Sequence, residues 1–153
     1  MSAGPEDVTV CFDGASRGNP GPAAIGVVVM RDGVPVDEIA ETIGVTTNNV
    51  AEYRALLRGL DEAARRGART VRLCSDSELV VRQLSGRYQV RSGQLLPLHE
   101  AARAKMRGFD RVTVVHVPRE QNQGADALAN QALDDAVRRR RGAAGPPGPS
   151  RRR

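Results

Sequence analysis

Aromatic residues and lysine are nearly absent from this chain. Phe, Tyr and Trp together make up 3% of its 153 residues, and Trp does not occur. Lys105 is the only lysine among the 23 basic residues, and the others are arginine. Because 40% of the residues are nonetheless hydrophobic, the chain can form a core. That core must consist mainly of Val, Leu, Ile and Ala.

The chain also lacks a long hydrophobic run, and it has only two cysteines, Cys11 and Cys74. The short polar N-terminal segment does not have the composition of a signal peptide, and we expect no membrane span. We therefore expect a cytoplasmic protein with both thiols reduced. Each cysteine precedes an aspartate by two residues on an expected strand, so it shares a face with that aspartate. The two thiols come close together if the two strands are parallel neighbours in register.

Charge is distributed unevenly along the chain. The net charge is +5, but residues 138–153 contain seven arginines and no acidic residue. The rest of the chain has 16 basic and 18 acidic residues, a net charge of −2. We divide the chain into a catalytic domain at 7–137 and a disordered basic tail at 138–153, because the tail has no core-forming residues. The tail is either a solvated end or a source of salt-dependent attraction to nucleic-acid phosphates.

Hydrophobic periodicity and turn residues predict five strands and four helices. The predicted strands are 8–12, 24–31, 34–43, 70–75 and 111–117. The predicted helices lie between Asn49 and Gly67 and at about 77–84, 95–106 and 123–138. Asp32-Gly33 is a hairpin signal, so the first three strands form an antiparallel meander. Since helical crossovers join parallel strands, the first, fourth and fifth strands should be parallel, and the fold class is α/β with a mixed five-stranded sheet flanked by helices.

Four acidic residues occupy positions where a carboxylate needs a partner. Asp13 ends the apolar run 8–12, and Asp76 ends the run 71–75. Glu52 and Asp126 each fall in the opening turn of a predicted helix. A buried, unpaired carboxylate costs roughly several kcal/mol. Because ligand sites in such sheets lie at the carboxyl ends of the parallel strands, we expect these acids to gather around a cation.

Four segments, taken in order, resemble type 1 ribonuclease H. They are Phe12-Asp-Gly-Ala-Ser-Arg-Gly-Asn-Pro-Gly21, Thr46-Thr-Asn-Asn-Val-Ala-Glu52, Cys74-Ser-Asp-Ser77 and Asn122-Gln-Gly-Ala-Asp-Ala-Leu-Ala129. The resemblance covers about residues 8–137 and implies a ribonuclease H-like fold. It implies endonucleolytic hydrolysis of the RNA strand of RNA–DNA hybrids, which leaves 5′-phosphate and 3′-hydroxyl ends.

The resemblance also implies which residues bind the cofactor. Asp13 would bridge two Mg²⁺ ions, for which Mn²⁺ is a plausible substitute. Glu52 and Asp76 would hold the ion near the attacking water, and Asp126 would help to hold the second. Two hard cations with oxygen ligands suit phosphodiester hydrolysis. Without metal the clustered acids should repel one another, which should raise the pKa of at least one.

The same resemblance implies a set of substrate-binding residues. Gly14, Asn19, Asn48 and Asn49 would line the groove that binds the duplex. Amide side chains both donate and accept hydrogen bonds, and the 2′-hydroxyl in the minor groove distinguishes RNA from DNA. The expected partner is an RNA–DNA hybrid, and double-stranded RNA stays open as a second substrate. We expect no membrane association and no obligate protein partner.

Each acid also has a purely structural explanation. Asn49-x-x-Glu52 is a capping-box pattern, and a helix dipole favours Asp126 near a helix N-terminus. Asp13 before a glycine fits a turn, and Asp76 could cap the helix that follows it. All four explanations together, in the order of this family, are far less probable than one shared site.

The chain departs from the family pattern in several places. The loop 118–124 has no histidine, and Arg119 or Glu120 is a candidate replacement. We expect His116 to be a packed or hydrogen-bonded core residue and His99 to lie on a solvated helix face. The segment 84–93 is too short for the basic protrusion that grips the hybrid in some members, so the tail is the first candidate for added affinity.

Two other functions fit part of the sequence. A non-catalytic module that binds hybrid or duplex RNA would need basic groups, and it would not need a carboxylate cluster. A phosphotransferase with Asp13 as covalent nucleophile usually has a second aspartate two residues later, where this chain has Ala15. The nuclease is therefore the leading hypothesis.

Overall fold

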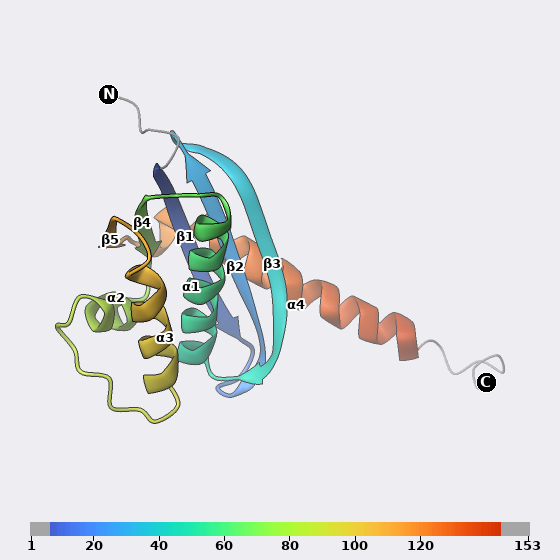
Figure 1. The fold of residues 1–153 in the computed structure, drawn as a ribbon. Helices are drawn as coiled ribbons and strands as arrows, with labels where there is room; N and C mark the ends of the chain where they lie inside the picture. The colour runs from blue at the N-terminus through green and yellow to red at the C-terminus, as the bar shows by residue number, and fades with distance from the viewer. Residues whose placement is uncertain (1–6, 145–153) are drawn as a thin grey trace.

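The computed structural model describes residues 7–144, in which helices cover both faces of one mixed sheet (Figure 1). The strands are β1 (Asp7–Ser16), β2 (Gly21–Arg31), β3 (Val34–Thr46), β4 (Thr70–Ser75) and β5 (Arg111–His116). They lie in the order β3-β2-β1-β4-β5. The first three are antiparallel, and β4 is parallel to both β1 and β5. The predicted fold class and strand directions are confirmed.

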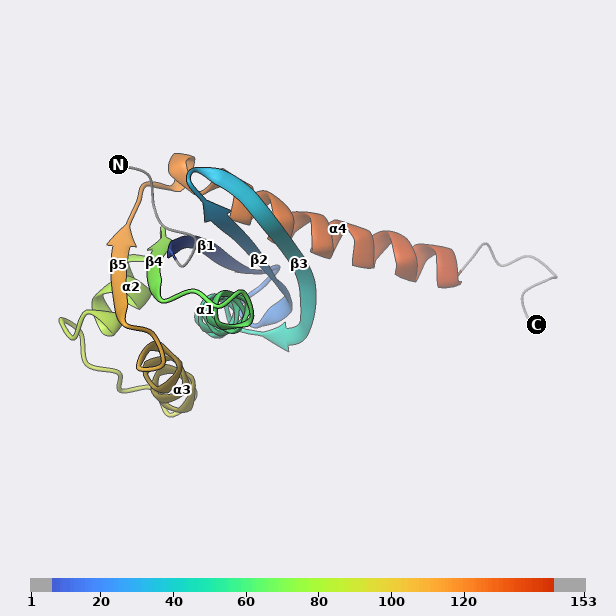
Figure 2. The ribbon, with the colours of Figure 1, turned by 45° about the horizontal axis from the view of Figure 1, so that its top comes forward.

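The helices divide into two layers. They are α1 (Asn48–Arg65), α2 (Glu78–Leu84), α3 (Leu96–Met106) and α4 (Gln123–Ala144), with a single 3₁₀ turn at Arg119–Gln121. Figures 1 and 2 show α1 on one face of the sheet and α4 crossing the opposite face and extending past β3. None of the helices within residues 7–144 is long and apolar enough to cross a bilayer.

The core on the α1 side is mainly aliphatic, as the shortage of aromatic residues predicts, and its fully buried aromatic residues are Phe12 and Tyr53. Its largest fully buried side chains include Phe12 of β1, Tyr53 and Leu56 of α1 and Leu73 of β4. On the α4 side the buried residues are smaller, among them Ala24, Cys11 and Ala132. The large side chains on the α1 side therefore fill the space between α1 and the central strands. The small side chains on the other side let α4 lie close to the sheet.

Two glycines allow the helices to approach the sheet closely. A Cβ on Gly14 of β1 would lie 2.2 Å from the carbonyl carbon of Ala51 in α1. A Cβ on Gly26 of β2 would lie 1.9 Å from the carbonyl oxygen of Ala125 in α4. Any larger residue would push a helix away from the sheet. The two glycines thus set the distance at which the acid-bearing turns of α1 and α4 face β1.

β1 is longer than the sequence predicts. The predicted strand ends at Phe12 and is followed by a loop, whereas β1 continues to Ser16. Asp13 and Gly14 pair with Gly26 and Ile25 of β2, so the antiparallel ladder extends through them. Turn-forming residues lose their local preference here because the long neighbouring strand satisfies their backbone groups. Asp13 therefore lies within a strand and not in a turn.

α4 also extends beyond its predicted end at Arg138. It continues to Ala144, so the predicted domain boundary after residue 137 falls inside the helix. Arginine is a good helix former, and cations near the C-terminus of a helix interact favourably with its dipole. Arg138 also pairs with Asp135 one turn earlier. Residues 145–153 of the predicted tail lie outside the described residues.

Both predictions about the histidines were wrong. His116 is exposed at the end of β5, because β5 is an edge strand with limited cover. His99 is half-buried where α3 packs against α1, and its Nδ1 lies 3.3 Å from the hydroxyl oxygen of Tyr53. Burial and the nearby Arg103 lower the pKa of His99.

Candidate metal site

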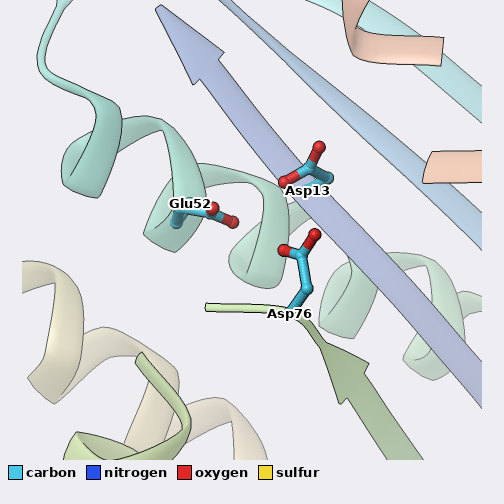
Figure 3. A group of neighbouring side chains, drawn as sticks. All are labelled: Asp13, Glu52 and Asp76. Carbon is cyan, nitrogen blue, oxygen red and sulfur yellow. The ribbon is translucent and has the colours of Figure 1, made fainter. Parts of the chain in front are cut away.

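Three carboxylates converge at one end of the sheet (Figure 3). Asp13 comes from β1, Glu52 from α1, and Asp76 follows β4 directly. One oxygen from each side chain lies within 4.8 Å of one oxygen from each of the others. Asp13 and Glu52 are each 5% exposed, so the cluster is largely closed to water.

The strand register explains why the two aspartates meet. β1 and β4 are parallel neighbours, and Cys11 lies directly beside Cys74. Asp13 and Asp76 each come two residues later, so they leave the two strands at the same level and on the same face. Glu52 reaches them because Gly14 leaves no side chain between β1 and α1.

The geometry excludes three of the four structural explanations for the acids. Glu52 Oε1 accepts a hydrogen bond from the backbone N–H of Gly14 at 3.1 Å, and Thr47 is the residue that caps α1. Ser77, and not Asp76, caps α2. Asp13 lies inside a β-ladder and not in a turn. The helix dipole still favours Asp126, which lies in the first turn of α4.

The carboxylates raise one another's pKa in the absence of a cation. Burial, together with the charges of Asp76 and Asp126, raises the pKa of Asp13 from 3.8 to about 8. Burial and the charge of Asp13 raise the pKa of Glu52, although the N–H of Gly14 partly offsets the rise. The predicted upward shift of at least one acid is confirmed. Like charges in a buried site favour either protonation or a bound cation.

Arg119 is the basic residue that comes nearest to this cluster among the described ion pairs. Its Nε lies 3.8 Å from Asp76 Oδ2, but its side chain is 82% exposed. A solvent-exposed pair at this distance compensates little charge. Three oxygen donors of net negative charge, with little compensation from the protein, fit a hard divalent cation.

Asp126 stands beside the group of three. Its carboxylate lies within hydrogen-bonding reach of Asp13, but it is not one of the three acids whose oxygens lie within 4.8 Å of one another. Asn130, one turn later in α4, donates from Nδ2 to the backbone oxygen of Asp126 at 3.0 Å and to its Oδ1 at 3.3 Å. Sequence reasoning missed Asn130, although its spacing of four residues from Asp126 was a usable signal.

The predicted substrate-binding amides lie together at the surface. Asn48 and Asn49 are exposed at the start of α1, and Asn19 is exposed in the turn between β1 and β2. Asn19 Oδ1 accepts a hydrogen bond from the backbone N–H of Asn48 at 2.9 Å. Gly14 differs from these three because it is buried against α1. Its N–H donates to Glu52, and its lack of a side chain permits the close approach of α1.

The thiols of Cys11 and Cys74 lie side by side beneath the cluster, as the sequence predicts for parallel strands in register. Both are buried and free. A hydrogen bond between them lowers the pKa of Cys74 to about 7 and, with burial, raises that of Cys11. They pack with Val28 and Val117, which is consistent with a role as small core residues.

Known structures with this arrangement define its class. A crystal structure of RNase H1 from Halobacterium salinarum superposes with a TM-score of 0.83 at 49% identity, over 84% of this chain and 98% of that one. LC11-RNase H1, solved in complex with an RNA/DNA hybrid, gives a TM-score of 0.81 at 40% identity, over 85% and 99%. The sheet, its helices and the acidic cluster thus define a domain of the ribonuclease H class.

Sequence comparisons identify the family. Residues 11–132 match the family described as reverse transcriptase-like. A ribonuclease HI of Halobacterium salinarum is 52% identical over 126 residues, which are 82% of this chain and 63% of that protein. A ribonuclease H of Halorhodospira halophila is 34% identical over 82% of this chain and 91% of that protein. The chain belongs to the type 1 ribonuclease H family, and it spans about 63% of the length of its Halobacterium relative.

Proposed function

We propose that this chain is a metal-dependent endoribonuclease that hydrolyses the RNA strand of RNA–DNA hybrids and leaves 5′-phosphate and 3′-hydroxyl ends. The convergence of Asp13, Glu52 and Asp76 carries this proposal. The hybrid bound to LC11-RNase H1 supports the choice of substrate. A binding module is the weaker alternative, because a cluster of acids repels the phosphates that it would have to bind.

The proposed cofactor is a pair of Mg²⁺ ions, with Mn²⁺ as a substitute. When bound, such ions activate the attacking water and stabilise the leaving oxygen of an in-line displacement. Asp13 interacts with the side chains of both Glu52 and Asp126, which supports the proposal that it would bridge the two ions. Glu52 and Asp76 would hold the first ion, and Asp126 would hold the second with Asp13.

The surface amides would position the hybrid over the acids. Asn48 and Asn49 present donors and acceptors at the N-terminus of α1, one turn before Glu52. Asn19 is held beside them by its bond to Asn48. We propose that these three side chains contact the minor groove, where the 2′-hydroxyls lie. Double-stranded RNA is the second candidate substrate.

The location proposed for this protein is the cytoplasm. The pair of free thiols is consistent with that reducing compartment.

The direct test is cleavage of a hybrid that carries a different label on each strand, with Mg²⁺ or Mn²⁺ or with chelator. Metal-dependent cutting of the RNA strand alone is the expected result. Tight binding of the hybrid without cutting under either ion would favour the binding module.

Asn130→Ala should weaken metal binding without unfolding the chain. Asn130 orients the Asp126 carboxylate through its Nδ2, and removal of such a supporting contact typically costs about 10- to 100-fold in metal affinity. Titration of Mn²⁺ measures this change, both by calorimetry and as the metal concentration that gives half-maximal cleavage. Gln131→Ala is the matched control, since Gln131 is exposed on the same helix. Equal metal affinity in the two variants would remove Asn130 from the site.

A further inference from the structure

A groove of about 470 Å³ lies between the sheet and the second half of α4. Its floor is apolar, with Ala23 of β2, Val45 of β3 and Leu133 and Ala136 of α4 among its lining residues. Val45 is 73% exposed, which is unusual for a valine in a strand. Arg139 and Arg140 complete the lining from α4.

The arginines at this groove are available for an external anion. Arg138 pairs with Asp135, but within residues 7–144 no ion pair involves Arg139, Arg140 or Arg141. No acidic residue follows Asp135 in the chain. Favourable interaction with the helix dipole explains arginines near the end of α4. It does not explain the apolar groove, with the exposed Val45, beside them.

The groove adjoins the proposed substrate interface. Two of its walls are β2, which begins at Gly21, and β3, which ends at Thr46, and these two residues pair. The exposed Asn19 lies two residues before Gly21, and the exposed Asn48 lies two residues after Thr46. The turn that carries Asn19 is tied to α4, because Arg17 Nη2 lies 2.6 Å from Asp134 Oδ1. The groove and the amides therefore share one end of the sheet.

We propose that this groove extends the substrate interface and receives the backbone of the duplex beyond the acidic site, with phosphates bound by Arg139 and Arg140. The identity of the duplex as a hybrid rests on the proposed function. Asp126 and Arg139 are separated by about 20 Å along α4, at about 1.5 Å per residue. That distance corresponds to about six base pairs at about 3.4 Å each. The arginine end of α4 thus replaces, on the other side of the site, the basic protrusion that segment 84–93 is too short to form.

The test compares hybrid binding by two double variants of the full chain, each in an Asp13→Asn background so that cleavage does not interfere. Arg139→Gln with Arg140→Gln removes two charges from the groove and keeps good helix formers in α4. Arg69→Gln with Arg111→Gln removes two charges at the end of the sheet opposite to the acids, where Arg69, which pairs with Asp110, directly precedes β4 and Arg111 begins β5. Fluorescence anisotropy with Mg²⁺ measures Kd over a range of salt concentrations.

Neutralising the groove should weaken binding of a hybrid of about 24 base pairs about tenfold at low salt, and it should flatten the salt dependence by about one unit of slope per lost contact. A hybrid of about 10 base pairs, which reaches the groove less well, should show a smaller change. The control variant should match its parent. An equal salt slope in the groove and control variants would overturn the proposal.

The binding measurement tests the groove separately from the proposed nuclease activity. If the chain without the Asp13 substitution cleaves hybrids but the groove variant binds normally, the extended interface fails and the nuclease stands. If the groove variant loses affinity while the unsubstituted chain never cleaves, the duplex-binding surface stands and the nuclease fails.

Discussion

Asp13→Asn and Asp76→Asn should each abolish hybrid cleavage while the chain still folds and binds hybrid. Each substitution removes one charged ligand from the group whose oxygens lie within 4.8 Å of one another. A metal ion contributes several kcal/mol of charge stabilisation in such reactions. Since each 1.4 kcal/mol is about a factor of ten in rate, we expect a loss of about 10³-fold or more. Single-turnover cleavage of a labelled hybrid with saturating Mg²⁺ measures it.

Binding and a distant carboxylate provide the controls. Both variants should bind hybrid at least as tightly as the unsubstituted chain, because they bring less negative charge to the phosphates. Asp110→Asn is the matched variant, since Asp110 is 63% exposed, pairs with Arg69 and lies at the other end of the sheet. Its cleavage rate should not change. Substantial cleavage by Asp13→Asn would rule out the proposed metal site.

Divalent cations should stabilise the chain strongly at pH 8 and weakly at pH 5. The folded-state pKa of Asp13 is raised from 3.8 to about 8. Between these values the unfolded chain loses this proton while the folded chain keeps it. The stability of the metal-free chain therefore falls as the pH rises through this window, by up to about 6 kcal/mol, given about 1.4 kcal/mol per unit of pKa difference. Below about pH 4 the stability no longer depends on the ionisation of Asp13, because this residue is protonated in both the folded and the unfolded chain.

Metal binding opposes this loss of stability at high pH, because the ion takes the place of the proton on the acids. An ion at 100 times its Kd adds about 2.7 kcal/mol, which is about 5–10 °C in Tm for a chain of this size. Thermal unfolding with Mg²⁺ or with chelator, at pH 5 and pH 8, measures the effect.

Two variants decide whether the acids are the source of this pH dependence. Asp13→Asn should be more stable than the unsubstituted chain at pH 8 in chelator, and it should gain little from Mg²⁺. Asp110→Asn should behave like the unsubstituted chain throughout. A Tm that responds neither to metal nor to pH between 5 and 8 would contradict a buried acidic site.

These two predictions concern one physical compromise. The buried acids destabilise the metal-free domain, and the hydrophobic layer around Phe12, Tyr53 and Leu56 offsets that cost. Replacement of Asp13 should therefore move stability and activity in opposite directions, which is common at functional sites. Replacement of a purely structural carboxylate would instead lower stability and activity together.

The sequence by itself determined the order of the elements, the strand directions and the identity of the clustered acids. Periodicity is a local property, so the amphipathic pattern of α1 and the apolar runs of β4 and β5 were readable without neighbours. The crossover rule made β1 and β4 parallel, and their pairing in register then brought Asp13 beside Asp76 and Cys11 beside Cys74.

Only the tertiary structure decided what depends on residues far apart in the chain. β1 continues through Asp13 because β2 pairs with it, and Glu52 bonds to Gly14, 38 residues away, where the local pattern offered a helix cap. The groove beside Arg139 likewise required the placement of α4 against the sheet. Local propensities differ by only about 1 kcal/mol per residue, so pairing and packing with distant segments override them wherever the two disagree.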